Sequence, residues 1–248
     1  MRGQPVGGAR CIHNVTAMTP GTFNQIRLTT DQFAAGAAFE RESRCVCALF
    51  MRFARARGAA LPPTRSIVGD FRRSPAPASA PAAVGPDAPD VIRIVQFDDI
   101  RDLMSLPDSE RRRAFLHLIL RTLDVFFDGV TPAAWLAAAA DVRAADFVNR
   151  WDWPPGAQRS PDRRRRSSVS VAHELRGFEI RLAVDDARGL PAFETVLVRG
   201  DETDERLIHG WLGELRWDGS DRIVLHPRNA DLAPLMVDVP EQFADTLA

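Results

Sequence analysis

The chain has 248 residues, of which 45% are hydrophobic and 26% are charged, and its formal net charge is −1. This length is enough for a sizeable core, and ordinary hydrophobicity with almost no net charge excludes a chain that is disordered throughout. All 32 basic residues are Arg, so a P-loop lysine and a Schiff-base lysine are both excluded. Such residue usage, with its abundant Pro and Gly, is typical of a bacterium with a G+C-rich genome.

Charge divides the chain near residue 90. Residues 1–90 carry 11 Arg against 6 acidic residues, a net of +5, whereas residues 91–248 carry 21 Arg against 27, a net of −6. We expect residues 1–58 to be a basic N-terminal extension that is disordered or partly helical. Within it, Thr30 and Asp31 can cap a helix whose apolar positions extend from Phe33 to Phe53.

Pro and Ala alternate between residues 74 and 81. This pattern cannot sustain a helix and offers little to bury, so we expect a Pro/Ala-rich linker over residues 59–90. The remaining residues, 91–248, are then expected to form one α+β domain.

That domain begins with a β-prone run at residues 91–95 and continues with two helices. Between residues 107 and 126, apolar residues recur at the i, i+3, i+4 spacing of a buried helical face. Gly129 is suited to end this helix, and Thr131 with Pro132 to begin a second helix that runs to Phe147. The short connection predicts a helical hairpin.

Residues 151–168 are polar and rich in Pro and Arg, which predicts a loop. Strands are predicted after it at residues 169–175, 178–184, 193–198, 207–217, 223–225 and 235–239. Short connections favour antiparallel pairing. The predicted fold class is therefore α+β: a helical hairpin followed by a mainly antiparallel sheet, preceded by a poorly ordered arm and the linker.

The cysteines offer one candidate metal site. Cys11, His13, Cys45 and Cys47 supply four soft ligands, enough for tetrahedral zinc. Their spacing leaves one residue between ligands rather than the usual two, so we favour no metal and no cofactor. Three cysteines are an odd number, which disfavours a disulfide framework and indicates the reducing cytoplasm.

Three histidines offer a candidate catalytic site. His173, His209 and His226 fall in or beside predicted strands, where they could bind a metal or act as acid and base in a metal-dependent hydrolase. The chain has no Gly-x-Ser-x-Gly elbow and no Gly-x-Gly-x-x-Gly fingerprint. We therefore lean towards a protein that is not an enzyme, with the hydrolase as a second alternative.

The run Arg163–Arg166 is the most basic local feature. Four adjacent guanidinium groups could neutralise phosphates, and Trp151 and Trp153 could stack on unpaired bases. The acidic balance of residues 91–248 argues against general nucleic-acid affinity. Nucleic-acid binding is accordingly an alternative rather than the first hypothesis.

An acidic segment supports the first hypothesis. Asp201, Glu202, Asp204 and Glu205 crowd one predicted hairpin loop, and Trp211 and Trp217 follow it closely. Acidic loops steer basic partners, and Trp and Arg are typical anchors of protein interfaces. We therefore expect an intracellular protein-binding module, an adaptor or an inhibitor similar in role to an immunity protein. Its expected partner is another protein, with a basic one as the first candidate. The chain has no apolar run long enough to span a membrane.

Overall fold

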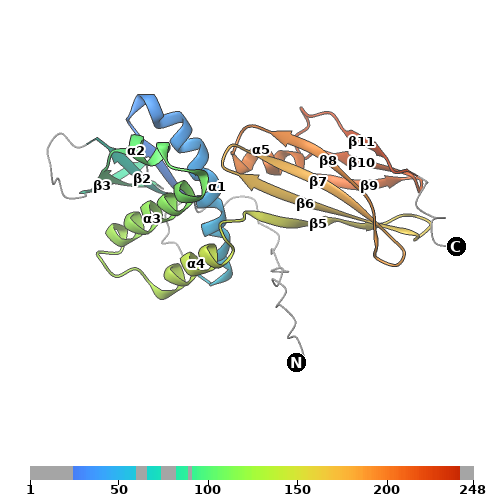
Figure 1. Cartoon of the computed structure of the whole chain (residues 1–248), viewed down its shortest axis with the longest axis horizontal. Coiled ribbons are helices and arrows are strands. Elements are labelled where there is room, and N and C mark those ends of the chain that lie inside the picture. Colours follow the sequence, from blue (N-terminus) through green and yellow to red (C-terminus); the bar gives the residue numbers. More distant parts are fainter. Residues whose placement is uncertain (1–24, 60–65, 74–81, 89–90, 241–248) are drawn as a thin grey trace.

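A computed structural model describes residues 25–59, 66–73, 82–88 and 91–240 of the chain. The structure has two lobes (Figure 1), one combining helices α1 to α4 with a sheet and one built mainly of strands. The predicted α+β class is confirmed. None of the described helices is long and apolar enough to cross a membrane.

The first lobe contains a four-stranded sheet with the order β1-β2-β4-β3. Its strands are β1 (Gln25–Thr30), β2 (Ser66–Arg72), β3 (Ala82–Ala88) and β4 (Val91–Phe97). β1 and β4 both pair in parallel with β2, and β3 pairs antiparallel with β4. The boundary expected near residue 90 therefore falls between two paired strands of one sheet, and the domain division is corrected.

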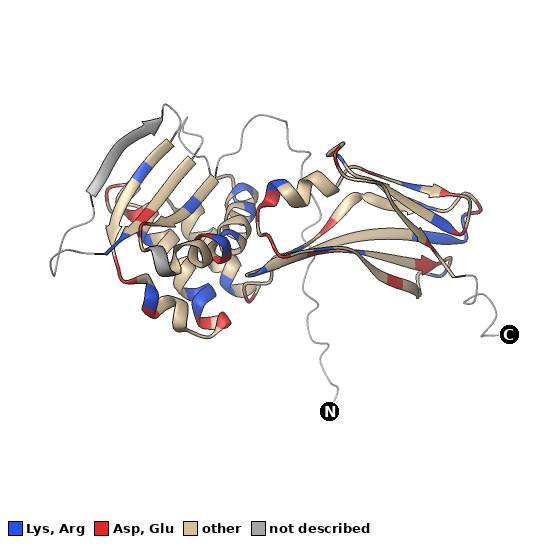
Figure 2. Ribbon diagram, turned by 90° about the horizontal axis from the view of Figure 1, so that it is seen from above, with Lys and Arg blue, Asp and Glu red and all other residues tan. Residues whose placement is uncertain are grey.

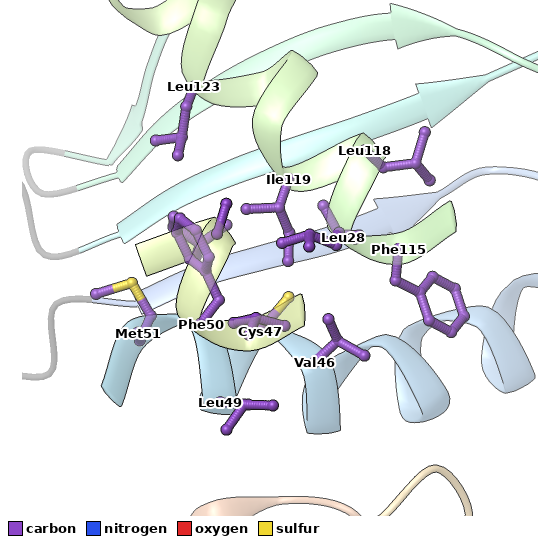
Figure 3. Packing of buried hydrophobic residues seen from close by; sticks show 14 of the residues in the cluster. Leu28, Val46, Cys47, Leu49, Phe50, Met51, Phe115, Leu118, Ile119 and Leu123 are labelled. Carbon is purple, nitrogen blue, oxygen red and sulfur yellow. The ribbon is translucent and has the colours of Figure 1, made fainter. Parts of the chain in front are cut away.

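Helix α1 (Phe33–Ala56) corrects the expected N-terminal extension within its described part, whereas residues 1–24 of that extension lie outside the described residues. The predicted helix exists, but Phe39, Val46 and Phe50 on it are almost fully buried. Figure 3 shows Val46, Cys47 and Phe50 lying opposite Phe115 and Ile119 of α3. Because burial of large apolar side chains drives folding, α1 belongs to the core rather than to an arm.

The two predicted helices and the short connection between them are confirmed. Helix α3 (Asp108–Phe126) begins directly after Pro107, and α4 (Ala133–Ala144) begins directly after Pro132. Between them Gly129 has a φ of 81°, a conformation that glycine adopts without the penalty of a Cβ. A short helix, α2 (Ile100–Ser105), connects the sheet to these helices.

The second lobe contains two antiparallel sheets. β5 (Arg150–Arg159), β6 (Arg165–Glu174), β7 (Gly177–Asp186) and β8 (Pro191–Gly200) form one in sequence order. β9 (Glu214–Asp218), β10 (Arg222–His226) and β11 (Leu235–Asp238) form the other, with β10 in the centre. Side chains from both sheets, such as Ile180, Leu215 and Leu225, share one buried cluster.

Two predictions for this lobe are wrong. Residues 151–168, expected as a loop, mostly form β5 and β6. The register shift between Trp153 and Gln158 accommodates Pro154 and Pro155, which a regular ladder would not tolerate. Residues 207–217, expected as one strand, are divided between helix α5 (Glu205–Trp211) and β9.

Candidate functional site

Helix α5 organises the surface that the acidic segment occupies. The helix begins at Glu205, a few residues after β8 ends, and Asp204 is its N-cap. The Asp204 carboxylate accepts a hydrogen bond of 2.9 Å from the backbone N–H of Arg206, which satisfies a donor that has no partner within the helix. The segment predicted as a hairpin loop therefore leads into α5. Asp201 and Glu202 precede the helix, whereas Asp204 caps it and Glu205 is its first residue.

A groove of about 510 Å³ runs along α5. Its size lies within the range of natural binding sites. The apolar lining residues are Phe178, Leu207, Trp211 and Leu232. The charged and titratable lining residues are Asp201, Glu202, Arg206, His209 and Arg228. Three of the six residues predicted for protein binding, Asp201, Glu202 and Trp211, therefore lie around one groove.

Asp201 and Glu202 are exposed at this groove, and neither forms an ion pair within the described part of the chain. Arg206 is already engaged, because its guanidinium lies 2.6 Å from the Asp204 carboxylate. Burial lowers the pKa of His209 below its ordinary value, so the imidazole is mostly neutral at pH 7. The groove thus combines two carboxylates that form no ion pair among the described residues, the exposed guanidinium of Arg228 and an apolar wall.

Asp204 and Glu205 serve a different purpose. Asp204 lies 3.9 Å from the guanidinium of Arg44, and Glu205 lies 3.7 Å from that of Arg52. Both arginines belong to α1, and Figure 2 shows the acidic start of α5 close to basic segments of the first lobe. These two acids connect the lobes, so the predicted acidic binding surface is reduced to Asp201 and Glu202.

Trp217, also predicted for the binding surface, does not line the groove. It lies on β9 and packs against the apolar cluster of the second lobe. Its indole Nε1 is buried without a hydrogen-bond partner among the described residues. Trp211 is half-buried at the groove, where its ring can contact a ligand.

The three histidines do not form one site. His173 is fully buried on β6, His209 lies on α5, and His226 is exposed at the end of β10. Across residues 25–59, 66–73, 82–88 and 91–240, no group of three or more His, Cys, Asp or Glu side chains could hold a metal ion. Nothing in this arrangement supports the hydrolase alternative.

A buried polar network surrounds His173, and the sequence patterns did not predict it. The Asn149 amide donates to the Cys45 carbonyl at 2.9 Å and lies 3.3 Å from His173 Nδ1. Arg52 donates to Asn149 Oδ1 at 2.6 Å, and the Cys45 thiol lies 2.9 Å from the His173 carbonyl. Because its members come from both lobes, only the folded structure brings them together.

Cysteine, histidine and asparagine also occur together in cysteine hydrolases, but this network lacks their electrostatics. Burial raises the pKa of the Cys45 thiol to about 12 and lowers the pKa of His173 to about 4. Both groups are therefore neutral at pH 7, whereas a nucleophilic cysteine is a thiolate. Cys45 and His173 are also at most 1% exposed, so a substrate cannot reach them.

Only two of the four residues of the zinc candidate, Cys45 and Cys47, belong to the described part of the chain. Cys47 is buried on α1, and burial raises the pKa of its thiol to about 12, so it is protonated at pH 7. A thiol must lose its proton to bind zinc. Cys11 and His13 lie outside the described residues.

The basic run is split by the turn between β5 and β6. Arg163, Arg164 and Arg166 are exposed, but Arg165 donates to the backbone carbonyls of Val239 and Pro240 at 3.3 and 3.2 Å.

The two tryptophans of the nucleic-acid hypothesis are occupied within the fold. Trp153 is 9% exposed, and the Arg52 guanidinium lies 4.0 Å above the Trp151 ring. The structure therefore offers exposed arginines without the stacking surface that binding of unpaired bases uses.

The chain matches no family model, and no curated protein or solved structure is similar to it.

Proposed function

We propose that the chain is a non-enzymatic protein-binding module, an adaptor or an inhibitor, whose α5 groove binds a basic segment of another protein. One observation carries this proposal: Asp201 and Glu202 have no ion-pair partner in the described structure and border the same groove as Trp211.

The carboxylates of Asp201 and Glu202 suggest the chemistry of the partner. Arg or Lys on the partner would gain charge-assisted hydrogen bonds to Asp201 and Glu202, and Arg could pair with a carboxylate through two parallel bonds. Because both carboxylates are exposed, they also attract a basic surface before contact and so raise the association rate.

The apolar lining of the groove can contact an apolar side chain of the partner. Leu207 is 47% exposed, and Trp211 lies on the same helix four positions later. Burying apolar surface contributes roughly 25 cal/mol per Å² before the entropic cost of association. We therefore infer a partner segment in which an aliphatic or aromatic residue lies beside the basic one.

The compartment inferred for this interaction is the cytoplasm. The described cysteines, Cys45 and Cys47, are free thiols, which suits a reducing environment.

Selection from a phage-displayed library of random peptides on the immobilised full chain tests the proposal. Enriched peptides should carry Arg or Lys next to an apolar residue, and should fail to bind the double variant D201N/E202Q. The variant D124N/D152N makes the same change in net charge at exposed carboxylates away from the groove, and should bind them normally. Enrichment of peptides without basic residues would contradict the proposal.

Single-stranded oligo-dT is a useful second probe, because it addresses the alternative function. Binding of oligo-dT that falls steeply with salt and is lost in R163Q/R164Q/R166Q would favour a nucleic-acid-associated protein instead.

A further inference from the structure

The described part of the chain begins beside helix α5. Gln25, the first residue of β1, lines a small cavity together with Asp204 and Arg206 at the start of α5. Arg206 also lines the α5 groove, so the cavity and the groove are neighbours. Residues 1–24, which lie outside the described residues, are therefore joined to the fold close to the groove.

This segment has the composition that the groove is inferred to recognise. Residues 1–24 contain Arg2 and Arg10 and no acidic residue. Ile12 follows Arg10 by two positions, and in an extended segment residues two positions apart project to the same side. Arg10 and Ile12 thus supply a basic side chain next to an aliphatic one.

The groove carries the opposite charge. Asp201 and Glu202 form no ion pair among the described residues, whereas Arg206 is already paired with Asp204 at 2.6 Å. Arg228, the remaining charged residue of the lining, offsets one of the two carboxylates, so the groove keeps a net negative charge. A segment with only positive charges is therefore attracted to it.

The length of the segment allows the contact. Arg10 precedes Gln25 by 15 positions, and a fully extended chain of that length spans up to about 50 Å. A tethered segment that can reach its site has an effective concentration of about 1 mM. A contact with a dissociation constant of about 0.1 mM would then fill about nine grooves in ten and weaken a competing ligand about tenfold.

We propose that residues 1–24 occupy the α5 groove of their own chain and compete there with the protein partner. Arg10 pairs with Asp201 or Glu202, and Ile12 contacts the apolar lining. This regulation rests on the proposed function, because it takes the groove to be a site for basic segments. A partner must displace the segment, so weakly binding basic proteins are excluded from the groove.

Photo-crosslinking in the full chain tests the contact without any partner. With p-benzoylphenylalanine in place of Ile12, irradiation should produce cross-links within one molecule to residues that line the groove, located by mass spectrometry. D201N/E202Q in the same protein should remove these cross-links, whereas D124N/D152N, at exposed carboxylates away from the groove, should retain them. Cross-links that form only between molecules, or that lie elsewhere on the fold, would overturn the proposal.

Calorimetric competition measures the strength of the contact. A basic peptide selected on the chain should bind R2Q/R10Q about tenfold more tightly than the wild type, because the groove is no longer occupied. R163Q/R164Q makes the same change in net charge at exposed arginines away from the groove, and should bind the peptide like the wild type. Equal affinity of R2Q/R10Q and the wild type would overturn this inference and leave the proposed function intact. Failure of every basic peptide to bind either protein would overturn both.

Discussion

Asn149 connects segments from both lobes through a single side chain. Its amide oxygen accepts from Arg52, and its amide nitrogen donates to the Cys45 carbonyl. Asn149 is 3% exposed, so water cannot replace these partners when the side chain is removed.

We therefore expect Asn149→Ala to lower the free energy of unfolding by about 1–3 kcal/mol, because it removes the hydrogen bonds that Asn149 forms with the Arg52 guanidinium and the Cys45 carbonyl. Urea denaturation followed by circular dichroism measures this change. Asn229→Ala is the matched control, since Asn229 is exposed and its side chain accepts one local hydrogen bond from Asp231. Equal effects of the two substitutions would show that the network contributes little.

His173 makes stability depend on pH. Burial lowers its pKa to about 4 in the folded chain, against an ordinary value of 6.5. As pH falls below 6.5, the unfolded chain takes up a proton that the folded chain does not, so stability is lost between pH 6.5 and 4. The loss is about 1.4 kcal/mol per pH unit, or about 3 kcal/mol over the window.

Urea denaturation at pH 7 and pH 5 should therefore show a larger loss of stability for the wild type than for His173→Gln. The difference between the two proteins isolates the contribution of His173 from that of the carboxylates. Parallel losses in both proteins would mean that His173 is protonated in the folded chain.

At the scale of elements, β7 and β8 approach each other closely where the groove begins. A Cβ on Gly177 would lie 2.1 Å from the carbonyl oxygen of Gly200, so the strands would have to separate. We expect Gly177→Ala to cost about 1–3 kcal/mol in the free energy of unfolding. It should also weaken peptide binding, because Gly200 lines the groove.

Gly210→Ala is the control for Gly177→Ala, and thermal denaturation compares the two variants. Gly210 lies on α5, and a Cβ there would meet Asn229 at an ordinary 3.6 Å. The gain in helix propensity of up to about 1 kcal/mol should leave this variant as stable as the wild type or more so. Destabilisation by Gly210→Ala equal to that of Gly177→Ala would contradict the described packing.

The elements that the sequence predicts well are those with long, regular apolar periodicity, such as α3, β7 and the helix from Phe33. β2 was missed because a short apolar run at Ile67 and Val68 lies between Pro-rich stretches, and its pairing with β1 and β4 is not local. α5 was missed because seven residues are too few to separate a helical period from alternation. Strong local signals identify elements, whereas sheet membership depends on contacts distant in sequence.

In the candidate site, too, the sequence predicted features that are local in the chain and missed those that depend on distant residues. The sequence predicted a binding surface that includes Asp201, Glu202 and Trp211, because acidic residues and Trp lie close together in the chain. It could not show that Asp204 and Glu205 are paired with Arg44 and Arg52, because those arginines are about 150–160 positions away. The network of Cys45, Asn149 and His173 was not predicted either, because its members are far apart in the sequence.

At the scale of the whole molecule, Arg52 is one of the side chains that connect the two lobes. It belongs to α1, and it contacts Asn149, the Trp151 ring and Glu205 beyond the first lobe. Thr203 adds a further connection through its hydrogen bond to the Arg41 carbonyl.

We expect Arg52→Met to lower the melting temperature and to divide unfolding into two calorimetric transitions, one for each lobe. Met retains much of the apolar stem but none of the hydrogen bonds or the cation–π contact. Arg188→Met is the control, because Arg188 is exposed in the turn between β7 and β8. One sharp transition at the wild-type temperature would show that the lobes are joined by other contacts.

The central claim is that the α5 groove recognises a basic protein segment through Asp201 and Glu202. The most direct measurement is the calorimetric affinity of a selected peptide for the wild type, D201N/E202Q and D124N/D152N at one salt concentration. We predict that D201N/E202Q binds the peptide at least about tenfold more weakly, as expected for lost hydrogen bonds to charged groups, while D124N/D152N binds it like the wild type. Equal affinity in all three proteins would contradict the account, because the partner would then be held elsewhere on the molecule.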